Sequence, residues 1–296
     1  MKNGQVLDSL IHHSRYRLAS CWQKPIINFV RFVRNQLRKR GLKFDETSEC
    51  RSVEIFHQKG FLIVSGEGVG EQLADYGIYE ESLTEAAVRL IKPGMTVIDV
   101  GCHLGYYTTL FAVLVGENGC VTSFEPTPST RKLTKLNSDR YHQTNVRPEA
   151  LWSSEGILTF RDYGLKWFAF NSFTKAKSDL ISTEAKEIQV PTITLDRLRK
   201  VDGRRIDLIK IDAESAEVEI LKGSQDILAL DRPVISIEMG DRAENCQSLT
   251  IFEIFKKAHY QPWEYGNGKF RLHQPRNWYT YDNLIFAPLE HDLSKR

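Results

Sequence analysis

The sequence contains little cysteine and no long apolar run. Its five cysteines, among 296 residues, are scattered, odd in number and form no CxxC pair. We therefore expect neither a disulfide framework nor a zinc site, and a reducing cytoplasm fits best. No stretch reaches the ~18 apolar residues that a membrane-spanning helix needs, and the first residues lack the apolar core of a signal peptide. These absences argue against a disulfide-rich secreted domain and a membrane-spanning protein.

A large excess of one charge is also missing. The formal net charge is +2, so no overall field points to nucleic acid, and we expect no nucleic-acid partner. The distribution is uneven, because residues 1–43 hold ten Lys or Arg and one acid, Asp8. Any basic partner surface is therefore confined to this arm. Hydrophobic residues (41%) and charged residues (26%) are close to a soluble globular average and leave material for a sizeable core.

The basic arm predicts a short amphipathic helix over residues 25–40, followed by Gly41 as a stop. Its apolar face consists of Ile26, Phe29, Val30, Val33 and Leu37. Packing of this face on the main domain is the favoured interpretation, and peripheral contact with an anionic membrane or a partner is the alternative. We divide the chain into an extension, residues 1–50, and a main domain, residues 51–290.

The main domain alternates between apolar runs and helical segments. Such alternation implies βαβ units and a mostly parallel sheet with helices on both faces. A hairpin around 58–60 and a helix at 83–91 are predicted to come first. The next predicted strands are 96–100, 120–124, 144–151, 206–211 and 234–237, with late strands around Trp263 and at 284–286; the helices are 106–114, 129–137, 216–222 and 249–258. The rhythm is lost over 156–194, which predicts an insertion of hairpins and loops.

The strongest motif runs from Val97 to Thr108, where an apolar strand leads into a turn with Gly101 and Gly105 and then into a helix. In open α/β sheets, ligands bind beyond the carboxyl ends of the strands. Glu125 ends the next strand, and a carboxylate there can accept hydrogen bonds from ribose hydroxyls. Together these features predict a nucleoside-containing cofactor.

Two details favour S-adenosylmethionine over a dinucleotide. Gly101 and Gly105 are four residues apart, so the turn is not GxGxxG. Asp99, at the strand tip, would repel a pyrophosphate at a helix N-terminus but suits a sulfonium and an ammonium group. An NAD-dependent oxidoreductase is therefore the less favoured enzyme.

On these motifs and others, the chain resembles the FkbM-type S-adenosylmethionine-dependent methyltransferases over about residues 78–288. The family usually has Ala-Asn where this chain has Cys102-His103, and Gly where it has Ser215. The further motifs are Tyr79-Glu80, Phe124-Glu125-Pro126, Leu195-Asp196, Ile209–Glu217, Leu221-Lys222-Gly223, Ile237-Glu238 and Asn283–Phe286.

The resemblance implies a Rossmann-like class I methyltransferase fold, with a mostly parallel seven-stranded sheet whose last strand is antiparallel. It also implies O-methylation of a hydroxyl on a sugar, glycan or natural product. Asp99, Gly101 and Gly105 would line the methionine portion, Glu125 the ribose, and Glu149-Ala150 the adenine. The complete set of candidate cofactor residues is Asp99, Gly101, His103, Gly105, Tyr107, Thr108, Glu125, Pro126, Glu149 and Ala150.

Methyl transfer to a hydroxyl benefits from a base and from groups that hold the acceptor. Lys210, Asp212 and Glu214 alternate at the end of a strand, so they point to one side and cluster beside the cofactor. Asp212 or Glu214 is a candidate base, but the lysine lowers carboxyl pKa values, which favours substrate binding or a charge network. His103, in the cofactor loop, and Glu238, at a later strand end, complete the candidate catalytic residues.

Alternatives remain for several features. Asp212, Glu214 and Glu238 would suit a divalent metal if they converged, but we expect no metal. The aromatic residues between 167 and 173 fit either a sugar-stacking surface or a hydrophobic cluster under a loop. Besides the enzymes, a non-catalytic scaffold or a binding module using the basic arm stays open.

Overall fold

The computed structural model describes residues 5–6, 9–10, 42–43, 49–165, 185–241 and 246–296. The predicted basic helix over 25–40 and the aromatic residues between 167 and 173 lie outside these ranges. Among the described residues, no helix combines the length and the apolar character needed to cross a membrane.

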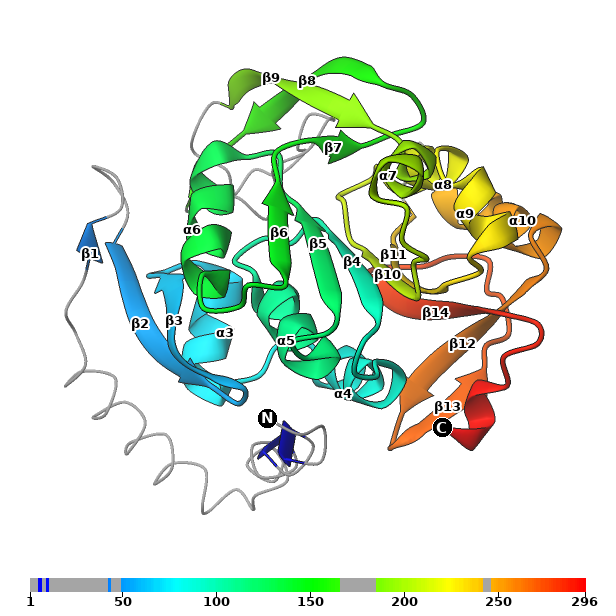
Figure 1. Ribbon diagram of the computed structural model, residues 1–296, viewed down its shortest axis with the longest axis horizontal. Helices are drawn as coiled ribbons and strands as arrows, with labels where there is room; N and C mark the ends of the chain where they lie inside the picture. Colours follow the sequence, from blue (N-terminus) through cyan, green and yellow to red (C-terminus); the bar gives the residue numbers. More distant parts are fainter. Residues whose placement is uncertain (1–4, 7–8, 11–41, 44–48, 166–184, 242–245) are drawn as a thin grey trace.

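An eight-stranded sheet forms the centre of the fold (Figure 1). Its order is β13 (Lys269–Leu272), β12 (Tyr260–Gly266), β14 (Asp282–Pro288), β11 (Val234–Met239), β10 (Leu208–Ile211), β4 (Thr96–Val100), β5 (Cys120–Phe124) and β6 (Thr144–Arg147). From β11 to β6 all neighbours pair in parallel, whereas β14 is antiparallel to both of its neighbours. The mostly parallel sheet with an antiparallel last strand is confirmed. It has one strand more than predicted, because β13 forms an edge hairpin with β12.

Helices cover both faces of this sheet, as predicted. Alternate residues of the central strands enter two separate cores, which is the pattern of a sheet buried on both sides. Val97 and Leu208 belong to one core, whereas Ile98 and Ile209 belong to the other. One face carries α3 (Gly68–Tyr76), α4 (Glu81–Leu90), α5 (Tyr106–Val115) and α6 (Pro128–Ser138), and the other α7 (Leu195–Asp202), α8 (Glu217–Lys222), α9 (Gln225–Leu230) and α10 (Gln247–Lys257).

Two small sheets flank the centre. The first contains β1 (Leu42–Lys43), β2 (Glu49–Ile55) and β3 (Gln58–Val64), and the predicted hairpin is present with its turn at 56–57, just before the predicted one. The second contains β7 (Ala150–Leu151), β8 (Gly156–Asp162) and β9 (Lys186–Ile193), and lies beyond the end of β6 (Figure 1). A short 3-10 helix, Leu293–Lys295, follows β14.

The predicted strand over 144–151 is wrong in its extent. β6 ends at Arg147, and Ala150–Leu151 pairs with β9 in the second small sheet. The chain therefore leaves the central sheet after Arg147, and Ala150–Leu151 belongs to the small sheet beyond the end of β6. The division into extension and main domain stays a prediction.

Candidate active site

A cavity lies at the carboxyl edge of the central sheet, where ligands bind in open α/β folds. It brings together the segments that follow the neighbouring parallel strands β10, β4 and β5, and it also includes Glu238 near the end of β11. Of the predicted site residues, it is lined by Gly101, His103, Tyr107, Glu125, Pro126, Ala150, Lys210, Asp212, Glu214 and Glu238.

Gly101 allows two of these segments to approach each other closely. Its φ of 73° lies in the left-handed region, and an added Cβ would overlap the carbonyl oxygen of Asp212. Gly105 has a similar role one step further, with φ 83° at the start of α5 and Thr134 of α6 packed against it. Gly105 therefore shapes the loop. It was predicted to line the methionine portion, but it is not among the residues that line the cavity.

Glu125 is a buried carboxylate fixed at the cavity wall. Its Oε1 accepts a hydrogen bond from the backbone N–H of Thr127 (3.0 Å) and its Oε2 one from that of His103 (3.2 Å). Burial raises the pKa of Glu125 to about 7, although these backbone bonds favour the ionised form. Each oxygen retains a lone pair, so the group can accept two further hydrogen bonds from a ribose.

Asp99 and Thr108 are not among the residues that line the cavity, and their assignment as cofactor contacts stays a prediction. Both are fully buried, and Thr108 Oγ1 donates to Asp99 Oδ2 at 2.7 Å. Asp99 Oδ1 has no hydrogen-bond partner among the described residues. Burial raises the pKa of Asp99, and the nearby Lys210 ammonium opposes this. Asp99 thus contacts α5 through Thr108, and Lys210 is its register partner on the neighbouring strand β10.

Glu149 also lies outside the cavity lining. It forms an ion pair with Arg147, and this bond lowers the pKa of Glu149. Its neighbour Ala150 does line the cavity. The cavity also has an apolar part of its wall that was not predicted as site residues: Val100, Phe124, Leu151, Phe160, Ala216 and Ile220.

Lys210 is a buried ammonium among acidic groups. Strand register places it directly between Asp99 on β4 and Ser236 on β11. Its Nζ lies 3.0 Å from Asp212 Oδ2 and 4.9 Å from the centre of the Tyr107 ring. Burial opposes the charge, but the carboxylates around it outweigh burial and raise the pKa of Lys210, so the ammonium stays charged.

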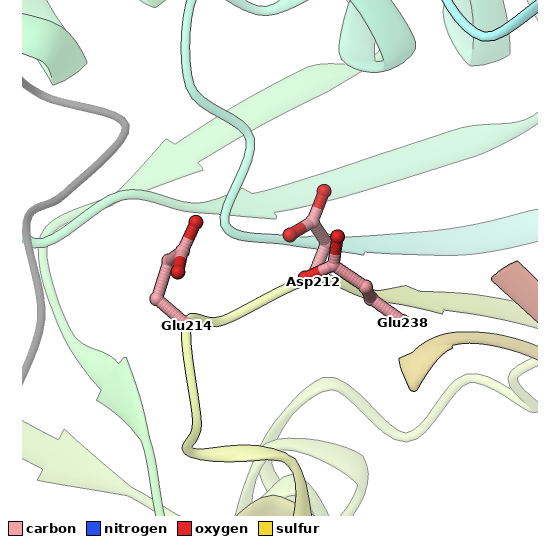
Figure 2. A group of neighbouring side chains, drawn as sticks. All are labelled: Asp212, Glu214 and Glu238. Atoms are coloured by element: carbon pink, nitrogen blue, oxygen red, sulfur yellow. The ribbon is translucent and has the colours of Figure 1, made fainter. Parts of the chain in front are cut away.

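Three carboxyl groups converge next to this lysine. Asp212 and Glu214 come from the loop after β10 and Glu238 from β11 (Figure 2), and one oxygen of each lies within 4.8 Å of the others. Burial, followed by the charges of Asp212, Glu214 and Glu217, raises the pKa of Glu238 to about 9. Carboxyl groups this close to one another can share a proton or bind a cation. The expectation that no metal binds here stays a prediction.

His103 lines the cavity as a neutral imidazole. It lies half-buried in the loop after β4, and desolvation of its ring lowers the pKa of His103 to about 3. Its backbone holds Glu125 through the N–H and accepts from Thr134 Oγ1 through the carbonyl. A ring with so low a pKa is a weak base at neutral pH.

Glu80, predicted only as part of the Tyr79-Glu80 motif, holds a side chain of the cavity wall, that of Tyr107. Its Oε2 accepts from the Tyr107 hydroxyl (3.0 Å) and its Oε1 from Asn283 Nδ2 (2.6 Å). Glu80 thereby joins the start of α4 to α5 and β14. Its φ of 42° is unusual for a residue other than glycine and supports a specific local role.

Comparison with known proteins identifies the family. The model of the methyltransferase FkbM domain matches residues 99–262, more than half of the chain. The chain belongs to this family. Membership confirms the predicted resemblance and S-adenosylmethionine as the cofactor.

Individual relatives are more distant. The protein-L-isoaspartate O-methyltransferases of Methanothrix thermoacetophila and Caenorhabditis elegans are each 26% identical, over 46% and 44% of this chain. The chain spans 57% and 53% of their lengths. A solved methyltransferase FkbM structure from Methylobacillus flagellatus is 14% identical, with a TM-score of 0.41 over 73% of this chain and 52% of that one.

The two departures from the family pattern coincide with unusual backbone angles. His103, in place of the usual Asn, has φ 54°, and Ser215, in place of the usual Gly, has φ 81°. Asn and Gly are the residues that adopt this left-handed region most readily. At both positions this chain therefore carries a residue that adopts the observed backbone angle less readily than the usual family residue.

Proposed function

We propose that this protein transfers the methyl group of S-adenosylmethionine to a hydroxyl of a sugar, glycan or other natural product. The observation that carries the proposal is the composition of one cavity. Glu125 and an apolar wall lie in the part formed by β4, β5 and the β7–β9 sheet, and Asp212, Glu214 and Glu238 lie in the part formed by β10 and β11. Such a cavity can hold a nucleoside and present an acceptor to it.

The residues present fit this cofactor. Glu125 would accept hydrogen bonds from the ribose hydroxyls, and Phe124 and Leu151 offer an apolar surface for the base. The carboxyl groups of Asp212 and Glu238 favour a positively charged ligand. When bound, S-adenosylmethionine supplies a methyl group on a cationic sulfur, open to in-line attack by an oxygen. The protein contributes the alignment of the acceptor with that methyl group.

Oxygen as the methylated atom has two supports. Both curated relatives are named O-methyltransferases. Carboxyl groups that crowd the acceptor side can hold hydroxyls and take up their protons. We also propose a small molecule or glycan as acceptor and the cytoplasm as compartment. The four cysteines in the described ranges, all free thiols, are consistent with a reducing compartment.

Calorimetric titration with S-adenosylmethionine and S-adenosylhomocysteine tests the proposal. We expect micromolar binding of both, with the affinity largely lost in Glu125→Ala. Glu253→Gln is the matched control, because Glu253 is exposed on α10, does not line the cavity and should leave the affinity unchanged. Failure of both ligands to bind the folded protein would contradict the proposal and favour a non-catalytic scaffold.

The acceptor is identified by transfer of a labelled methyl group. A panel of methyl glycosides and hydroxylated metabolites, followed by mass spectrometry of the products, should give a methyl ether. Exclusive methylation of amines in a parallel amine panel would refute oxygen as the acceptor atom.

A further inference from the structure

A second, smaller cleft adjoins the cofactor cavity. The two share Glu214 and Glu238 in their walls, so these residues stand where the spaces meet. The cleft also contains the hydroxyl groups of Ser215 and Thr280 and the side chain of Tyr281, which is 70% exposed. Hydroxyls, carboxyls and an exposed aromatic ring suit a ligand that is itself rich in hydroxyl groups.

Two of the four carboxyl groups that line the cleft, those of Glu217 and Asp241, hold neighbouring backbone in place. Glu217 Oε1 accepts hydrogen bonds from the backbone N–H groups of Ala213 and Ser215. Asp241 accepts from the N–H and hydroxyl of Ser248. Both groups are thus occupied in shaping the loops around the cleft.

Asp212 and Glu238 differ in whether their carboxyl groups already have a partner. Asp212 pairs with Lys210 at 3.0 Å. Within the described part of the chain, the Glu238 carboxyl makes neither a hydrogen bond nor an ion pair. Its partner across the sheet is Asn283, whose amide is used by Glu80. Glu238 is therefore half-buried, at the junction of both spaces, and available for a ligand.

We propose that Glu238 is the general base of methyl transfer and that the acceptor hydroxyl reaches it through the cleft lined by Ser215, Thr280 and Tyr281. The assignment rests on the proposed function. The acceptor O–H bond breaks, its proton moves to a Glu238 carboxylate oxygen, and the O–C bond forms as the C–S bond breaks, with that electron pair left on sulfur.

The charges around Glu238 explain how it can act at neutral pH. The groups that face it are Tyr79, Lys210, Asp212, Glu214 and Glu217. With burial and three neighbouring carboxyls, the pKa of Glu238 is about 9, so the group carries a proton at pH 7. A positive ligand in the cavity lowers this pKa and releases the proton before reaction. His103 and Asp212 are poorer candidates, because His103 is a weak base and Asp212 is held by Lys210.

Proton release on ligand binding tests this without an acceptor. S-adenosylmethionine carries one positive charge more than S-adenosylhomocysteine. Titrations at pH 8 in two buffers of different ionisation enthalpy give the protons released by each ligand. We expect wild type to release up to about one proton more with S-adenosylmethionine. Glu238→Gln should bind both ligands and lose this difference, whereas the exposed control Glu253→Gln should keep it.

Several outcomes overturn the assignment while leaving the proposed function intact. One is binding of both ligands by wild type with no difference in protons released. Another is a difference that persists in Glu238→Gln. A third is methyl transfer that is abolished by EDTA and restored by Mg²⁺, because the carboxyl groups would then hold a metal. Failure of both ligands to bind contradicts the proposed function itself.

Discussion

Glu125 and Glu238 are the same residue type in one cavity, yet their surroundings differ. Glu125 is held by two backbone N–H groups, and its pKa is raised by burial to about 7. Glu238 has no such bonds in the described chain and lies among other carboxyl groups, and its pKa is about 9. A fixed carboxylate is suited to binding, whereas a crowded one that changes protonation is suited to proton transfer. The contrast divides the cavity into a binding half and a reacting half.

Glu238→Gln should separate these halves most strongly. We expect kcat to fall about 10²–10⁴-fold, because the base is removed, with the Kd of S-adenosylhomocysteine, which lacks the sulfonium charge, changed less than about threefold. Steady-state kinetics with an acceptor from the glycoside panel measures both. An unchanged kcat in Glu238→Gln would mean that Glu238 is not the base and would contradict the division of roles between Glu125 and Glu238.

Lys210→Met tests the charge balance beneath the reacting half. Removing the ammonium leaves Asp99, Asp212 and Glu80 without their buried counter-charge. We expect a loss of about 3 kcal/mol in the free energy of unfolding, larger at pH 8 than at pH 5 because the carboxyls can protonate at low pH. Urea denaturation measures it. Lys222→Met, at an exposed pair on α8, should change stability by less than about 1 kcal/mol.

The pH dependence of stability tests the binding half. The pKa of Glu125 is raised from 4.5 in its ordinary state to about 7 in the fold. Its contribution is therefore fully present below about pH 4.5 and is lost as the pH rises through 7. Relative to Glu125→Gln, wild type should lose on the order of 3 kcal/mol of unfolding free energy between pH 4 and 8. Urea denaturation measures the free energy of unfolding of both proteins. If that free energy changed equally with pH in the two proteins, the pKa of Glu125 would not be raised by the fold.

Ser215→Gly is expected to have the smallest effect. At φ 81°, glycine relieves the strain on a residue that bears a Cβ. We expect stabilisation by about 1 kcal/mol and a melting temperature about 2–4 °C higher, measured by calorimetry. The same backbone should persist, so S-adenosylhomocysteine should bind with unchanged affinity. A lower melting temperature would mean that the Ser215 side chain has a stabilising contact.

The central fold could be predicted because its strands are short apolar runs with clear ends. β4 and β5 have the predicted bounds, since each run stops at Gly101 or at Glu125-Pro126. The segment 144–151 was misread because a local pattern does not show that the chain changes sheets after Arg147. The short helices α7 and α9 and the edge strand β13 were missed, because only a few of their residues are buried.

The candidate site was predictable where strand ends carry polar residues. Glu125, Asp212 and Glu238 line the cavity. The depth of Asp99 could not be read from its position, because alternation gives the face of a strand and not the distance from the edge. Glu149 had a usable signal, since Arg147 lies two residues away on the same side. The apolar wall, including Phe160 from β8, depends on tertiary packing that no motif marks.

Binding of S-adenosylhomocysteine, which carries no sulfonium charge, to wild type, Glu125→Ala and Glu238→Gln tests the division of the cavity most directly. Calorimetry should show micromolar binding of S-adenosylhomocysteine to wild type, a Kd at least about tenfold higher in Glu125→Ala, and a nearly unchanged Kd in Glu238→Gln. Equal losses in both variants, or a loss in Glu238→Gln alone, would contradict the assignment of one carboxyl to binding and the other to proton transfer.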